Sequence, residues 1–75
     1  MGNEAQRKFR DLLVEARKKA NLTQAELSSR LKRPQSFVSK YERGERRLDV
    51  IEFVVVARAL GVDPIQFIEK LYREI

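Results

Sequence analysis

Residues 23–44, TQAELSSRLKRPQSFVSKYERG, decide the fold that can be predicted for this chain. Thr23-x-x-Glu26 has the spacing of a capping box, in which the two side chains accept backbone amides at the start of a helix. Pro34 cannot continue that helix, but its fixed φ suits the first turn of a new one. Gly44 is suited to the left-handed position that follows a helix. The stretch therefore predicts two short helices joined by a tight turn.

The flanking segments predict three further helices and no strand. Residues 4–20 carry apolar side chains at the i, i+3, i+4 spacing of a one-faced helix. Asp49 can cap a fourth helix that ends before Gly61, and Asp63-Pro64 can start a fifth. We expect one all-α domain over residues 1–75. Its five helices are predicted at residues 4–20, 24–31, 35–43, 50–60 and 64–75.

The composition argues against several classes of function. The chain has no cysteine and no histidine, so disulfides, thiolate metal sites and Ser-His or Cys-His nucleophiles are not expected. The longest apolar run, Phe53 to Ala57, is far too short to span a membrane, and the polar N-terminus does not resemble a signal peptide. We expect no enzyme activity, no metal, no cofactor, no small-molecule ligand and no membrane partner.

Charge is distributed unevenly along the chain. The formal net charge is +5, with +7 in residues 1–47 and −2 in residues 48–75. A basic front half with a mildly acidic rear half favours a polyanion bound on one side of the molecule. A solvated, soluble surface explains the charge alone equally well.

Two motifs in the central stretch carry a family resemblance. Gln24-Ala25-Glu26-Leu27 is followed by Val38-Ser39-x-Tyr41-Glu42-x-Gly44, and ARALGVDP ends the pattern at residues 57–64. The chain resembles the phage-repressor/Cro-like (XRE-type) helix-turn-helix proteins over nearly its whole length. This resemblance implies a five-helix bundle of the lambda-repressor-like type, with the helix-turn-helix at residues 23–44 and double-stranded DNA as the partner. A short helix, a tight turn and a second short helix also have the geometry that lays the second helix in the major groove.

The resemblance and the chemistry of the side chains together predict the residues that contact DNA. Glutamine can pair with adenine, lysine can reach guanine, and serine can bond to several base edges. The base-reading positions are Gln35, Ser36, Ser39 and Lys40. The positions expected at the DNA backbone are Gln24, Arg33, Phe37, Arg43, Arg46 and Arg47. Phe37 lies at the edge of this exposed row, where an aromatic ring can alternatively pack on the second helix.

Other positions bear on the geometry of the helix-turn-helix. Arg17 and Glu42 match a partly buried salt bridge that orients the recognition helix in family members. Lys32 stands where many relatives have glycine in a left-handed conformation, at a cost of about 1 kcal/mol. Pro34 stands where relatives have a hydroxyl-bearing cap, so the sequence does not show what caps the third helix.

The last two helices, residues 49–75, carry more apolar surface than one buried face requires. Part of this surplus can cover the core of a short domain. The other interpretation is an isologous homodimer, which places two recognition helices about 34 Å apart on DNA. The residues expected at its interface are Ile51, Val55, Ala59, Ile68, Tyr72 and Ile75.

Together these features predict a sequence-specific transcriptional regulator of the Cro/cI repressor type, homodimeric on a palindromic operator. We expect it in the cytoplasm, associated with the nucleoid of a bacterium or acting for a phage. The alternative is a protein-interaction module with the same fold, such as an antitoxin or a subunit of a larger regulator. An apolar patch left exposed in the homodimer would favour that alternative.

Overall fold

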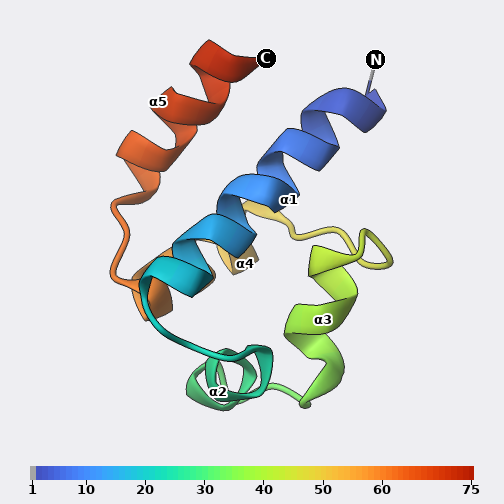
Figure 1. Ribbon diagram of the computed structural model, residues 1–75, viewed down its shortest axis with the longest axis vertical. Helices are drawn as coiled ribbons and strands as arrows, with labels where there is room; N and C mark the ends of the chain where they lie inside the picture. The colour runs from blue at the N-terminus through green and yellow to red at the C-terminus, as the bar shows by residue number, and fades with distance from the viewer. Residues whose placement is uncertain (1) are drawn as a thin grey trace.

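The computed structural model describes residues 2–75 and consists of five α-helices joined by short connections (Figure 1). No strand occurs within this range. The predicted all-α fold is confirmed, and every predicted helix end lies within two residues of the observed one. The helices are α1 (Gly2–Lys19), α2 (Gln24–Arg30), α3 (Ser36–Glu42), α4 (Val50–Leu60) and α5 (Pro64–Glu74).

Local side-chain bonds fix where the middle helices begin. Thr23 Oγ1 accepts the amide of Glu26 at 3.0 Å, and Glu26 Oε1 accepts the amide of Thr23 at 2.8 Å, which completes the predicted capping box. A second capping box joins Asp49 and Glu52 at the start of α4. Gly61 ends α4 in the left-handed conformation, with φ 72°. These interactions depend on residues close in sequence, and the helix ends were therefore predictable.

The core forms where all five helices meet. Figure 1 shows the start of α1 and the end of α5 at the same end of the molecule, with α2 at the opposite end. Helix α1 contacts α3 and α5, while α2 contacts α3 and α4. The rings of Phe9, Phe53 and Phe67 lie 5.0–5.9 Å apart and join α1, α4 and α5. The buried apolar residues are Leu12, Leu13, Leu22, Leu27, Phe37, Val38, Tyr41, Phe53, Val56, Ala57, Leu60 and Phe67.

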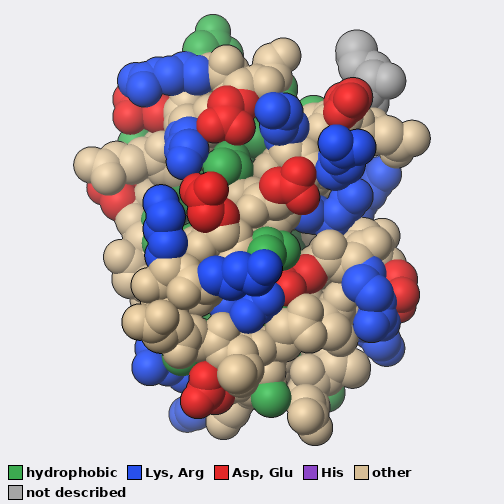
Figure 2. All heavy atoms as spheres, in the orientation of Figure 1, with side chains coloured by type: hydrophobic (Ala, Val, Ile, Leu, Met, Phe, Trp, Pro, Cys, Tyr) green, Lys and Arg blue, Asp and Glu red, His purple; other side chains and the backbone are tan. Residues whose placement is uncertain are grey.

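The face seen in Figure 2 is densely charged. Basic and acidic side chains are interspersed on it, and little hydrophobic surface is visible. Within residues 2–75, no helix is both long enough and apolar enough to cross a membrane. The same residues contain no cluster of three acidic, histidine or cysteine side chains that could hold a metal ion.

Candidate nucleic-acid interface

The turn between α2 and α3 is fixed by backbone bonds and by one buried hydroxyl. The amide of Arg33 donates to the carbonyl oxygen of Ser28 at 3.0 Å, and Lys32 adopts the expected left-handed conformation with φ 56°. Ser28 is fully buried; its Oγ donates to the carbonyl oxygen of Gln35 and accepts the amide of Val38, each at 3.2 Å. The Ser28 hydroxyl thus accepts a backbone amide in the first turn of α3, where the N-cap residue Gln35 makes no side-chain hydrogen bond. Ser28 therefore holds α3 against α2, a role that the sequence pattern does not indicate.

The predicted base-reading residues lie along one edge of α3. Gln35, Ser36 and Lys40 are exposed, and Ser39 is half-buried. They form two adjacent pairs, 35–36 and 39–40, and the separation of four positions between the pairs places them on one face of a helix. Ser39 Oγ donates to the carbonyl oxygen of Ser36 at 3.0 Å, so its hydroxyl keeps acceptor capacity for a partner. The result is a short polar row on a helix whose opposite face is buried.

An ion pair between α1 and α3 sets the orientation of that row. Arg17 Nε donates to Glu42 Oε2 at 2.8 Å and Arg17 Nη2 to Glu42 Oε1 at 3.2 Å. Arg17 Nη1 also donates to the carbonyl oxygen of Leu22 at 2.8 Å. The side chains of Arg17 and Glu42 are only 11% and 5% exposed. The structure therefore brings together the pair that the resemblance implied.

Gln24 belongs to the same network. Its Nε2 donates to Glu42 Oε1 at 2.8 Å, which directs the amide group toward α3. The family resemblance implied that Gln24 contacts a DNA phosphate. In the structure its side chain bridges the start of α2 and the end of α3 through one N–H, and the second N–H of Nε2 stays available for a phosphate oxygen.

The arginines expected at the DNA backbone differ in what they contact. Glu52 accepts Arg46 through both carboxylate oxygens, at 3.0 and 2.7 Å, and also accepts Arg33 at 3.0 Å. Arg43 donates to Glu45 at 2.8 and 3.2 Å. No ion pair within residues 2–75 involves Arg47 or Lys40; both are exposed. The hydrogen bond from Arg46 and the amide of Asp49 lower the pKa of Glu52 to about 2, so this carboxylate is ionised at neutral pH.

Phe37 is buried, although one expectation placed it at the DNA backbone. Its ring is 6% exposed and packs edge-on against Tyr41, with ring centroids 5.6 Å apart. The guanidinium carbons of Arg33 and Arg46 lie 4.6 and 5.0 Å from the centre of the Phe37 ring. Phe37 is a core residue beneath two arginines, and its assignment as a direct DNA-backbone contact stays a prediction that its low exposure does not favour. The alternative of packing describes it.

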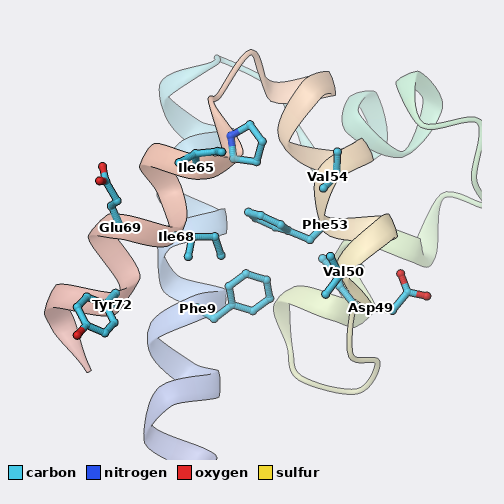
Figure 3. A pocket seen from close by; sticks show the side chains of 11 residues that line it. Phe9, Asp49, Val50, Phe53, Val54, Ile65, Ile68, Glu69 and Tyr72 are labelled. Carbon is cyan, nitrogen blue, oxygen red and sulfur yellow. The ribbon is translucent and has the colours of Figure 1, made fainter.

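An apolar groove lies between α4 and α5 on a different part of the surface (Figure 3). Its volume is about 620 Å³. Figure 3 shows Phe9 and Phe53 between the two helices, while the carboxylates of Asp49 and Glu69 point away from them. We call this surface the α4–α5 groove; its lining residues are Phe9, Leu48, Asp49, Val50, Phe53, Val54, Pro64, Ile65, Ile68, Glu69 and Tyr72.

The residues expected at a dimer interface are divided between surfaces. Ile68 and Tyr72 line the α4–α5 groove, and Ile75 is exposed at the end of the chain. Ile51 and Val55 are exposed beside a separate hollow of about 140 Å³. Ala59 is half-buried and packs against the core of its own chain.

Two features were not predicted from the sequence. Glu52 was not expected to be the shared partner of two arginines, and Val50 and Ile65 were not among the predicted interface residues. A signal for Glu52 was present, because Asp49-x-x-Glu52 repeats the capping-box spacing of Thr23-x-x-Glu26.

Comparison with known proteins agrees with this architecture. A helix-turn-helix family model matches residues 13–67. An XRE-family like protein from Pseudomonas syringae pv. tomato str. DC3000 is 52% identical, with a TM-score of 0.93 over 97% of this chain and 89% of that one. The wild-type restriction-modification controller protein C.Esp1396I is 23% identical, with a TM-score of 0.83 over 93% and 92% of the two chains, and shows a similar fold. No curated protein sequence matches the chain. The chain belongs to the XRE-type helix-turn-helix family.

Proposed function

We propose that this protein is a sequence-specific regulator of transcription that binds double-stranded DNA as a homodimer, with α3 in the major groove. Membership of the helix-turn-helix family supports the DNA-binding regulator. The observation that carries the proposal is the exposed polar row of Gln35, Ser36 and Lys40 on a helix anchored through Ser28 and Glu42. An anchored helix presents these groups to base edges in one orientation, as direct readout requires.

Backbone contacts in this proposal come chiefly from Arg47 and from the amides at the start of α2. Arg47 is exposed and has no ion-pair partner among the described residues, and helix-start amides attract phosphate oxygens. Arg33 and Arg46 share Glu52, so their combined charge near the DNA is reduced. We expect these two arginines to support the loop that follows α3, with a smaller phosphate contribution.

The homodimer is supported by the α4–α5 groove. Val50, Ile65 and Tyr72 are each more than two-thirds exposed, although their side chains are large and apolar. A contiguous apolar surface of this kind is typical of a protein interface. A twofold axis beside this groove would use the same surface of both copies and leave the two α3 helices free. A spacing of about 34 Å between them would match successive major grooves on one side of DNA.

Selection of bound sequences from a random duplex pool tests the proposal directly. The expected result is an enriched, approximately palindromic sequence whose half-sites are one helical turn apart. Competition between the enriched duplex and a scrambled duplex measures specificity. Equal affinities for the two duplexes would refute sequence-specific reading.

Light scattering tests the homodimer and locates its interface. Ile65→Glu should dissociate the dimer, because it introduces a charge into the α4–α5 groove. Val55→Glu is the matched control, since Val55 is an exposed apolar residue of α4 outside the groove. Dissociation of the dimer by Val55→Glu, but not by Ile65→Glu, would assign the interface to the surface around Ile51 and Val55. A monomeric wild type at high micromolar concentration would overturn the dimer.

The exposed surface around Ile51 and Val55 favours one alternative function. In a dimer formed through the groove, this second apolar surface stays uncovered. The alternative is a protein-interaction module, such as an antitoxin or a subunit of a larger regulator. Purification with a stoichiometric protein partner, combined with no enrichment of any duplex, would favour this module over the DNA-binding regulator.

A further inference from the structure

Arg43 is the C-cap residue that follows α3, close to the predicted base-reading row, and its guanidinium already binds a carboxylate. Arg43 Nε donates to Glu45 Oε2 at 2.8 Å and Nη2 to Glu45 Oε1 at 3.2 Å. The two side chains are 58% and 53% exposed. A guanidinium binds a carboxylate and a phosphate through the same two-pronged geometry. Glu45 therefore occupies the group that the sequence assigns to a DNA phosphate.

The backbone holds Glu45 in this position. Gly44 takes the left-handed conformation with φ 82°, and the amide of Glu45 donates to the carbonyl oxygen of Lys40 at 2.9 Å. The carboxylate can rotate away from Arg43, but its Cα stays beside the end of the recognition helix. Its charge consequently remains close to the DNA after any exchange.

We propose that Glu45 competes intramolecularly with DNA phosphate for Arg43 and thereby limits the affinity of this protein for every duplex. The inference rests on the proposed DNA-binding function and concerns the strength of the same site. An exposed ion pair of this kind is weak in water, so a phosphate can displace the carboxylate. When a phosphate replaces the Glu45 carboxylate at Arg43, the two bonds between Arg43 and Glu45 are lost. The released carboxylate then lies near other phosphates, which repel it.

Glu52 does not have this role, although it binds two arginines. Its side chain is only 16% exposed, and the capping box with Asp49 fixes it to the start of α4. Its bonds to Arg33 and Arg46 join the turn after α2 to the loop after α3. Glu45 lacks such a structural role, because its side chain contacts only the neighbouring Arg43 among the described ion pairs. The two carboxylates can therefore be separated by experiment.

Fluorescence anisotropy with a short duplex of random sequence tests the inference without knowledge of the operator. Glu45→Gln should bind about two- to tenfold more tightly than the wild type at low salt. The plot of log affinity against log salt between about 50 and 200 mM should be steeper by up to about 0.9, the contribution of one more phosphate contact. Its urea unfolding midpoint should match that of the wild type.

Glu15→Gln is the matched control. Glu15 is 50% exposed, pairs with Lys70 at 3.2 Å, and lies on the part of α1 that faces α5. This variant changes the net charge by the same amount, but at an ion pair between α1 and α5 and not at the end of the recognition helix. Its affinity should change less than that of Glu45→Gln. Equal gains in the two variants would assign the effect to net charge and overturn the competition.

A double substitution separates competition from simple repulsion. The gain from Glu45→Gln should shrink when Arg43 is replaced by glutamine, because no guanidinium is then released. An undiminished gain would overturn competition for Arg43. If the wild type binds duplex DNA and Glu45→Gln binds no more tightly, this inference fails alone. If no variant binds any duplex, the proposed function fails and this inference with it.

Discussion

Replacement of Arg17 by methionine tests whether the α1–α3 ion pair orients the recognition helix. Methionine keeps much of the length and apolar packing of arginine but removes its charge and its donors. The change removes two bonds to Glu42 and one to the carbonyl oxygen of Leu22. The side chain of Glu42 is 5% exposed, and within residues 2–75 it then keeps only the amide group of Gln24 as a side-chain partner.

The expected cost follows from leaving a buried charge without its partner. Removing one member of a buried ion pair typically costs about 3–5 kcal/mol. The surviving bond from Gln24 to Glu42 favours the lower end of this energy range. We therefore expect the free energy of unfolding to fall by about 3 kcal/mol. For a domain of this size, about 4–8 °C of melting temperature accompanies each kcal/mol. The melting temperature should therefore fall by about 12–24 °C.

A paired substitution distinguishes orientation from stability. Arg17→Met combined with Glu42→Met removes both charges, and at least half of the lost stability should return because no buried charge is unpaired. Sequence-specific binding should stay weaker than in the wild type, since α3 has lost its tie to α1. Melting is followed by circular dichroism at one fixed protein concentration, and binding by anisotropy. An unchanged melting temperature for Arg17→Met, or wild-type discrimination between operator and scrambled DNA in the double variant, would refute this reasoning.

Three further tests give separate readouts. The pKa of Glu52 is about 2 in the folded state, below its ordinary value of 4.5. The ionised carboxylate therefore stabilises the fold above pH 4.5, and this stabilisation is lost as the pH falls toward 2. The urea midpoint of Glu52→Gln should vary less over this range than that of the wild type. Arg47→Ala should weaken binding to all duplexes without changing the melting temperature, whereas Arg46→Ala should lower the melting temperature because Glu52 loses two bonds; equal effects of the two changes would contradict the division between them. Lys32→Gly should raise the free energy of unfolding by up to about 1 kcal/mol, because φ at this position is 56°, and a decrease would show that the side chain contributes more than its strain costs.

The sequence predicted those features that depend on neighbouring residues. Thr23 with Glu26, Asp49, and Gly61 each mark a helix end through bonds that reach only a few positions along the chain. The left-handed conformation at Lys32 was also predictable, because the family pattern marks that position. The same locality explains why all five helices were found close to their observed bounds.

Contacts between distant residues were predicted less well. Arg33 and Glu52 are 19 positions apart, and nothing in the local pattern indicates that they meet. Phe37 lies at the edge of the exposed row on a helical wheel, but its contacts with Tyr41, Arg33 and Arg46 bury it. Tertiary packing, and not the helical period of α3, decided that the Phe37 ring faces the core.

The apolar surplus of the last two helices shows the same limit. The sequence indicated correctly that α4 and α5 expose large apolar side chains, but it could not show how the helices cross. The crossing groups Val50 and Ile65 with Ile68 in the α4–α5 groove, and leaves Val55 on another surface. A helical wheel orders residues around one axis, whereas a groove is formed by two axes and the angle between them.

The structure lowers the basic charge expected near the recognition helix. The predicted DNA-contacting residues include five basic side chains, and the structure sets two carboxylates against three of them. The local net charge is therefore about three per protomer. Since each neutralised phosphate contributes about 0.9 to the salt slope, the slope per protomer should be nearer −2.7 than −4.5. A measured slope near −4.5 would show that DNA displaces Glu45 and Glu52 together, and would contradict the fixed structural role of Glu52.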